Sequence, residues 1–392
     1  MDLTLQPKNL ALYERAKVLS KELLAPRARQ YDDEARFPRE NLDALAKEGF
    51  TCLTLPEEDG GFDMYSDPTT YVMILFELSK GCTNTALLLH MHNSITHFLM
   101  TLGTPAQRKN LSTLVRDGKI IASHGGEAGT STQWKRKLDT HAKLVGEKFV
   151  INGRKVFCSM AGEADYYTLW VQIGEDWDVR KSMSFLFCPA NHPGFTIDSQ
   201  WNSYALRGTA SHSLKIENVD VSADSLFGKG GDPIRADITP KFALGYSAVY
   251  LGVGAAAYEW VLDYAQKRKL KPDNVSISSY QPIQRLIGEM KIEMEKALLM
   301  VQHAAWKLKT FGAEEAFPNI SAAKYTASEA SASITDKAIK VAGGAGLLRE
   351  NPLERLHREA RSGLVMPPNS EKCLDSVAKS IIEANPEFVG TP

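Results

Sequence analysis

The chain is short of cysteine and of net charge. Its 392 residues include five cysteines, an odd number without paired short spacings, so we expect no disulfide framework and a reducing, cytoplasmic compartment. The formal net charge is only −1, which argues against a nucleic acid or a membrane surface as a partner attracted by charge. With 43% hydrophobic and 24% charged residues, the composition is that of a soluble globular protein.

Long apolar runs and a secretory leader are also missing. No stretch approaches the roughly 18 apolar residues that a membrane span needs. Residues 1–6 lack a basic segment followed by an apolar core, so no secretory signal is expected. What the chain does have is length, because 392 residues at about 100–200 residues per domain predict two or three domains.

Helical spacing dominates the first part of the chain. Apolar residues recur at helical intervals over residues 10–23. Further helices are expected over residues 69–80 and 84–102. A third is predicted from Thr104, whose hydroxyl can cap the helix, with Pro105 suited to its first turn.

The apolar period changes to two after residue 118 and returns to helical spacing near residue 236. Strands bounded by turn residues are predicted over 119–122, 166–172, 183–188 and 213–221. Four long helical segments follow, and the Ala- and Ser-rich residues 321–333 suit close packing within a bundle or between subunits. These patterns predict an α+β protein with an N-terminal helical domain (1–118), a central β-sandwich or β-barrel domain (119–232) and a C-terminal four-helix bundle (233–392).

An Asn-Gly pair at Asn152 and Gly153 lies between two β-prone runs, 148–151 and 154–158. Asn-Gly tolerates the positive φ angles of a type I′ turn, so the pair predicts a β-hairpin. The second run ends in an aromatic residue, Phe157, followed by a hydroxyl and small residues. Such an ending can place a flat ring beside a side-chain hydroxyl and closely approaching backbone.

A Gly-rich loop, Ser-His-Gly-Gly-Glu-Ala-Gly-Thr-Ser at 123–131, follows the first predicted strand. Together with residues 151–162, it resembles the flavin-binding centre of the acyl-CoA dehydrogenase superfamily. Residues 206–211, Leu-Arg-Gly-Thr-Ala-Ser, resemble a turn of that family. Residues 342–346, Ala-Gly-Gly-Ala-Gly, resemble a loop that touches the dinucleotide of a neighbouring subunit. The motifs keep the family's order over nearly the whole chain.

The resemblance implies an enzyme with FAD as cofactor and an acyl-CoA or another acyl thioester as substrate. It implies α,β-dehydrogenation, in which a proton leaves Cα while a hydride leaves Cβ for flavin N5. It also implies a homotetramer or a dimer, and an electron-transfer flavoprotein or a flavin reductase as redox partner. The three-part plan of helices, β domain and helices is the same as that predicted from periodicity.

The resemblance also implies roles for individual residues. The cofactor-binding residues that it implies are Gly125, Gly126, Glu127, Phe157, Ser159, Arg268, Gln281, Gly343 and Gly344. Thr130 would face the phosphopantetheine arm of the thioester, and Ser159 would hydrogen-bond near flavin N5. Arg207, Thr209 and Ser211 match positions that contact a pyrophosphate or support the strand, and they could equally cap a turn.

Three histidines, His90, His92 and His97, lie close together on one predicted helix. Positions 90 and 97 share a helix face while 92 is rotated away, and no carboxylate or thiolate completes a set, so we predict no metal site. We expect this helix to line a substrate pocket or the core, with His92 contacting substrate. His124 stands where the family commonly has Thr or Ser, so we expect it to contact substrate, and its presence there indicates either altered chemistry or altered packing.

The residue expected to act as catalytic base is missing. In the family a Glu near the C-terminus removes the α-proton, and its backbone N–H helps to bind the thioester carbonyl. The matching position here is Pro367, which has neither a carboxylate nor an N–H. The base position that some members use instead falls on Phe242. Glu371 is the candidate catalytic residue, or it only decorates the start of the final helix.

Two other functions remain open. A flavin-dependent monooxygenase on the same fold would need no α-proton base. A catalytically silent protein would bind an acyl thioester without any redox change. Reduction of the flavin by an acyl-CoA distinguishes a dehydrogenase from both alternatives.

Overall fold

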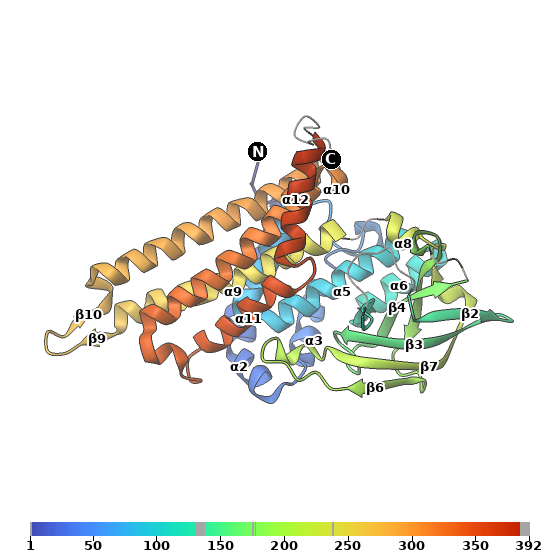
Figure 1. Cartoon of the computed structure of the whole chain (residues 1–392), viewed down its shortest axis with the longest axis horizontal. Helices are drawn as coiled ribbons and strands as arrows, with labels where there is room; N and C mark the ends of the chain where they lie inside the picture. The colour runs from blue at the N-terminus through green and yellow to red at the C-terminus, as the bar shows by residue number, and fades with distance from the viewer. Residues whose placement is uncertain (1, 130–137, 175, 177, 237–238, 385–392) are drawn as a thin grey trace, which may run out of the picture.

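The computed structural model describes residues 2–129, 138–174, 176, 178–236 and 239–384. The chain forms a helical N-terminal part, a central sheet and a helical C-terminal part, as the sequence predicted. Figure 1 shows the sheet at one end of the molecule and the C-terminal helices extending toward the other, with the N-terminal helices between them.

The N-terminal helices lie where helical spacing placed them. Their bounds are α1 Leu10–Leu19, α2 Ala25–Glu34, α3 Arg39–Lys47, α4 Pro68–Gly81, α5 Thr83–Leu102 and α6 Pro105–Arg116. The predicted start of α6 is confirmed in detail, because the Thr104 hydroxyl accepts the Gln107 N–H while the Gln107 side chain accepts the Thr104 N–H. The helices α4 and α5 are buried along most of their length.

Eight strands form the central sheet in the order β6-β7-β3-β2-β4-β5-β8, with β1 paired to β4. Their bounds are β1 Ile121–His124, β2 His141–Val145, β3 Lys148–Cys158, β4 Tyr166–Ile173, β5 Met183–Pro189, β6 Phe195–Ser199, β7 His212–Ser222 and β8 Leu226–Phe227. The strand β4 pairs in parallel with β1 and β2, and the other pairings are antiparallel. Short helices α7 (Val179–Ser182) and α8 (Asp232–Arg235) flank β5 and β8.

The hairpin predicted at Asn152 and Gly153 is wrong. The strand β3 runs unbroken through both residues, and the turn that joins it to β2 lies at Gly146 and Glu147. Asn152 and Gly153 instead form an irregularity in the pairing of β3 with β7. The Asn152 side chain accepts the Asn218 backbone N–H of β7, so a strand distant in sequence decides the local conformation.

The C-terminal helices are α9 Thr239–Lys267, α10 Gln281–Ala342, α11 Leu353–Val365 and α12 Ser370–Ala384. A two-stranded hairpin, β9 (Lys269–Leu270) with β10 (Val275–Ser276), joins α9 to α10. The long α10 is two helices, because Gly312 adopts φ 85°, which is outside the helical region. Its Ala- and Ser-rich residues 321–333 are largely buried beside α9, which favours packing within the bundle. Among the described helices, none is long and apolar enough to cross a membrane.

Candidate active site at the end of β3

The end of β3 lies directly against the turn at residues 206–211. The Met160 N–H donates to the Thr209 carbonyl at 2.9 Å, and the Ala161 N–H donates to the Ala210 carbonyl at 3.2 Å. Four residues of these two segments, Phe157, Met160, Leu206 and Ala210, have positive φ, out of eight such non-glycine residues in the described chain. Left-handed backbone at non-glycine residues is costly and gathers at functional sites, so this junction is the candidate active site.

Three hydroxyls form a chain at the junction. Ser159 Oγ lies 2.9 Å from Ser211 Oγ, which lies 2.7 Å from Thr209 Oγ1. Thr209 Oγ1 donates to the Leu206 carbonyl at 3.0 Å. Thr209 and Ser211 are buried, while Ser159 is partly exposed, so of these three hydroxyls only that of Ser159 can reach a bound molecule.

An exposed aromatic ring, that of Phe157, lies two residues before this hydroxyl in the chain. Phe157 is 74% exposed, although Phe is among the residue types that are most often buried. Its ring meets the edge of Trp201, with the ring centroids 6.2 Å apart. The Trp201 indole N–H donates to the Leu206 carbonyl and so fixes the Trp201 ring to the facing turn. The arrangement suits a planar ligand whose polar edge meets Ser159.

The Gly-rich loop reaches the same place from β1. The Val156 N–H donates to the Gly126 carbonyl at 2.9 Å, so the loop lies on the backbone of β3. A Cβ at Gly126 would lie 2.7 Å from the Val156 carbonyl oxygen, and one at Gly125 would lie 2.8 Å from the Trp170 ring. Both positions therefore require glycine. Thr130 falls outside the described residues.

Glu127 anchors this loop inside the sheet. Its buried carboxylate accepts from Lys155 Nζ at 2.7 Å and from the backbone N–H groups of Asp139 and Thr140 at 2.7 and 3.0 Å. Burial alone would raise the pKa of Glu127, but Lys155 and these hydrogen bonds outweigh burial and hold the pKa below its ordinary value. The carboxylate thus joins β1, β2 and β3, which the sequence motif did not indicate.

His124, the last residue of β1, is buried beside Tyr167, with the ring centroids 4.6 Å apart. Burial lowers the pKa of His124 to about 3, so the imidazole is neutral. Neither ring nitrogen has a hydrogen-bond partner among the described residues. Contact between His124 and a substrate stays a prediction.

The remaining predicted cofactor residues lie elsewhere. Arg268 immediately precedes β9, Gln281 opens α10, and Gly343 and Gly344 follow the end of α10. Figure 1 shows these segments at the end of the helical part that lies away from the sheet. A single chain therefore does not bring these four residues to Phe157 and Ser159.

The linker between α11 and α12 replaces the expected base-bearing segment with two prolines. The buried Lys324 holds the start of this linker. Its Nζ donates to the Gly363 carbonyl, in the last turn of α11, at 2.7 Å and to the Met366 carbonyl at 3.4 Å. Asn369 caps α12 by accepting the Lys372 N–H at 2.9 Å. Glu371 is exposed in the first turn of that helix, where an acid suits the helix dipole, and its catalytic role stays a prediction.

The predicted substrate contact of His92 is wrong. His92 is fully buried, and its two ring nitrogens pair with the Thr51 carbonyl at 3.1 Å and the Ile121 N–H at 3.0 Å. It ties α5 to β1 instead of lining a site. His90 bonds to Tyr71 and the Phe242 carbonyl, and His97 accepts from Lys241.

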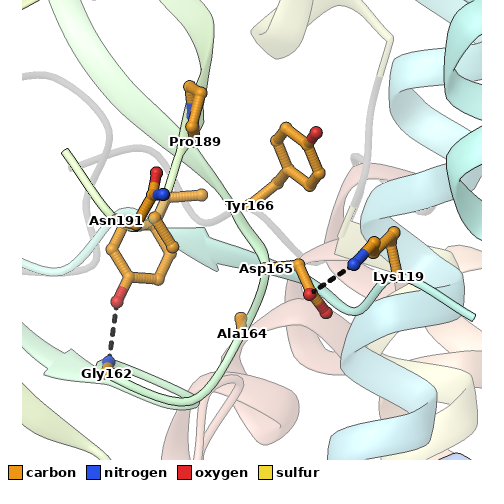
Figure 2. Close-up of a pocket in the computed structure, with 9 residues that line it drawn as sticks. Lys119, Gly162, Ala164, Asp165, Tyr166, Pro189 and Asn191 are labelled. Carbon is orange, nitrogen blue, oxygen red and sulfur yellow. Dashed lines mark hydrogen bonds and ion pairs between the residues drawn. The ribbon is translucent and has the colours of Figure 1, made fainter.

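A hollow of about 340 Å³ lies between Lys119, the 162–167 segment that follows β3, and residues 189–191 at the end of β5. Figure 2 shows the Lys119–Asp165 ion pair on one side of it and Gly162 on the other, and the Gly162 N–H donates to the Tyr167 hydroxyl. None of the residues predicted to bind cofactor or substrate lines this hollow.

Comparison with known proteins decides the family. Three family models match successive parts of the chain: the N-terminal domain of acyl-CoA dehydrogenases at residues 6–119, the middle domain at 124–219 and the C-terminal domain at 242–382. The chain belongs to the acyl-CoA dehydrogenase superfamily.

Individual members are similar along their whole length. The chain is 29% identical over 371 residues to the putative acyl-CoA dehydrogenase YdbM of Bacillus subtilis, covering 91% of this chain and 93% of that protein. It is 26% identical over 377 residues to the short-chain specific acyl-CoA dehydrogenase of Clostridium acetobutylicum, covering 95% and 97%. Among solved structures, butyryl-CoA dehydrogenase from Megasphaera elsdenii superposes with a TM-score of 0.89 at 23% identity, covering 97% of this chain and 100% of that one.

Proposed function

We propose that this protein is an FAD-dependent oxidoreductase that dehydrogenates an acyl thioester between Cα and Cβ. Membership of the superfamily supports the reaction class. The observation that carries the proposal is the junction of β3 with the 206–211 turn. There an exposed ring, a hydroxyl and a closely packed glycine loop offer the ring face, the hydrogen bond and the backbone approach that a flavin needs.

Each residue of the junction makes a different contact with the proposed flavin. Phe157 covers the ring face, Ser159 hydrogen-bonds the ring edge, and the loop at Gly125 and Gly126 offers its backbone from a position fixed by contacts with Trp170 and Val156. A bound flavin supplies the hydride acceptor. The buried Glu127–Lys155 pair holds the loop in place and leaves its backbone N–H groups fixed before binding.

Assembly into a dimer or tetramer forms part of the proposal. The predicted cofactor residues fall into two groups, one at the end of β3 and one at Arg268, Gln281, Gly343 and Gly344. If both groups hold one dinucleotide, a second copy must supply the second group. Light scattering tests this proposal, because a particle mass near the 43.3 kDa of one chain would rule it out.

The decisive experiment is an anaerobic titration of the FAD-loaded protein with a panel of acyl-CoAs. Bleaching of the flavin absorbance by one member identifies a dehydrogenase and its substrate class. A protein that takes up no FAD in excess would overturn the proposal. If FAD binds but no thioester bleaches it, the absence of a carboxylate and an N–H at Pro367 favours the monooxygenase alternative, which is tested with a flavin reductase and oxygen.

Glu371 can be tested in the same assay. If it removes the α-proton, Glu371→Gln keeps FAD and thioester binding and slows bleaching by about 10²–10⁴-fold. An unchanged bleaching rate assigns Glu371 to the exposed first turn of α12 alone.

A further inference from the structure

One buried amide joins the three parts of the chain. Asn84, in the first turn of α5, is 1% exposed. Its side-chain oxygen accepts the backbone N–H of Gly208 at 3.1 Å, in the turn that faces β3. Its side-chain nitrogen donates to Glu359 Oε1 of α11 at 3.2 Å. Asn84 therefore links the N-terminal helices to the 206–211 turn and to the C-terminal part.

The direction of both hydrogen bonds is fixed by chemistry. A backbone N–H only donates and a carboxylate only accepts, so the Asn84 amide fits in one orientation. Glu359 is itself held, because it is fully buried and its Oε2 accepts from the Thr83 hydroxyl at 2.7 Å and from Arg355 Nη1 at 2.9 Å. The site of the Gly208 N–H is thus set by a carboxylate on α11.

The contact continues to the candidate active site. Gly208 precedes Thr209, whose carbonyl accepts the Met160 N–H and whose hydroxyl bonds to Ser211 Oγ. Ser211 Oγ in turn lies 2.9 Å from Ser159 Oγ. Gly208 has little room to move, because a Cβ there would lie 2.8 Å from the Arg36 carbonyl oxygen. A shift of Gly208 would therefore move Thr209 and, through the Ser211 hydroxyl, the hydroxyl of Ser159.

We propose that Asn84 and Glu359 are positioning residues that set the Ser159 hydroxyl through the 206–211 turn. The consequence is that α11 controls the geometry of a site built on the sheet, although no residue of α11 belongs to the β3 junction. The effect of Asn84 and Glu359 on flavin binding rests on the proposed function, whereas their effect on the conformation of the 206–211 turn does not.

The test exchanges the two polar groups. Asn84→Asp places two carboxylates against each other and removes the donor to Glu359. Asn84→Asp combined with Glu359→Gln restores one amide and one carboxylate, with the hydrogen bond reversed and the negative charge moved from residue 359 to residue 84. Lys337→Met is the control, since it removes a half-buried ion pair with Glu293 on α10 without touching the turn.

Two readouts separate this proposal from the proposed function. In the protein without flavin, hydrogen exchange at the backbone N–H groups of Gly208, Met160 and Ala161 should speed up in Asn84→Asp, return toward wild type in the double variant and stay unchanged in Lys337→Met. With FAD, the dissociation constant should rise about tenfold in Asn84→Asp and recover in the double variant, because a buried polar group loses its partner.

The outcomes are distinct. Exchange and affinity that are unchanged in Asn84→Asp would overturn the positioning role. A wild-type protein that binds no FAD would defeat the proposed function, while the exchange measurement would still decide the effect on the turn. If Asn84→Asp does not fold, Glu359→Gln alone is the test, since it keeps volume and a hydrogen-bonding group. Faster exchange at Gly208 supports the proposal, and exchange like that of wild type contradicts it.

Discussion

The two glycine-rich loops of this chain have opposite surroundings. At residues 125–127 the loop lies on β3, and its first two glycines have neighbouring atoms where a Cβ would be. At residues 343–346 the first two glycines have no atom of the described chain within 4 Å of such a Cβ. The residues that follow, Leu347 and Leu348, are 66% and 50% exposed.

The difference shows that similar composition serves two purposes. The first loop is completed by its own chain, through the Val156 hydrogen bond and the Glu127 anchor. The second loop ends a helix and presents open backbone beside exposed leucines. Its surroundings fit contact with another molecule, which agrees with the proposed second copy of the chain. Substitutions in the first loop should therefore destabilise the single chain. Substitutions in the second loop should have an effect only in an assembly.

The largest effect on the first loop is expected from Lys155→Met. This change leaves the Glu127 carboxylate buried without its cation, and breaking a buried pair in this way costs about 3–5 kcal/mol. Urea unfolding of the flavin-free protein measures the loss. Lys155→Met with Glu127→Gln removes the buried charge and keeps an acceptor for one of the Asp139 and Thr140 N–H groups, so it should lose less.

Lys340→Met is the matched control beside the second loop. Lys340 is exposed near the end of α10, and such changes usually stay within about 0.5 kcal/mol. Equal losses for Lys155→Met and Lys340→Met would contradict the contrast between the loops.

Gly126→Ala should have the next largest effect. The added methyl group would press on the Val156 carbonyl oxygen, which is backbone and cannot rotate away. Overpacking of this kind costs about 1–3 kcal/mol. A lower urea midpoint, with an unchanged dependence on urea concentration, is the expected result. An unchanged midpoint would show that the loop yields more easily than its contacts indicate.

Local patterns predicted the parts of this structure that local chemistry decides. The Thr104 cap, the bounds of α4 and α5 and the strand leading to Phe157 all follow from neighbours within a few residues. Residues that act over long range could not be found this way. Pairing with β7 makes Asn152 and Gly153 an irregularity within a strand instead of a turn. The side chain of His92 is structural because it bonds to the backbone of Thr51 and Ile121, in two other segments.

The buried polar residues of the candidate site are the clearest case. Asn84 and Glu359 are 275 positions apart, and no spacing rule relates them. Lys155 lies in a strand, and lysine is usually exposed. Only its inward position beside Glu127 identifies it as part of a buried ion pair. A lysine at an inward-facing strand position was the single signal in the sequence, and it has meaning only once the facing carboxylate is known.

A pH-dependent effect should come from His124, which flanks the first loop. Burial lowers its pKa from 6.5 to about 3, so the unfolded chain binds a proton below pH 6.5 that the folded chain does not. Stability therefore falls as pH drops from 6.5 toward 4, by about 1.4 kcal/mol per pH unit at most. His124→Gln should flatten that part of the profile, although the buried His90, His92 and His97 keep a remaining slope.

The smallest effect on the single chain is expected at Gly344. Gly344→Ala adds a methyl group into open space, so the free energy of unfolding should change by no more than about 0.5 kcal/mol. Gly344→Arg should be equally harmless to one chain, because the same space is open. In an assembly the two differ, since a methyl group fits many interfaces while an arginine does not. We therefore expect Gly344→Arg, and not Gly344→Ala, to lower the particle mass in light scattering. If both variants keep the wild-type mass and the wild-type affinity for FAD, the second loop faces solvent, and its contrast with the first loop is one of exposure alone.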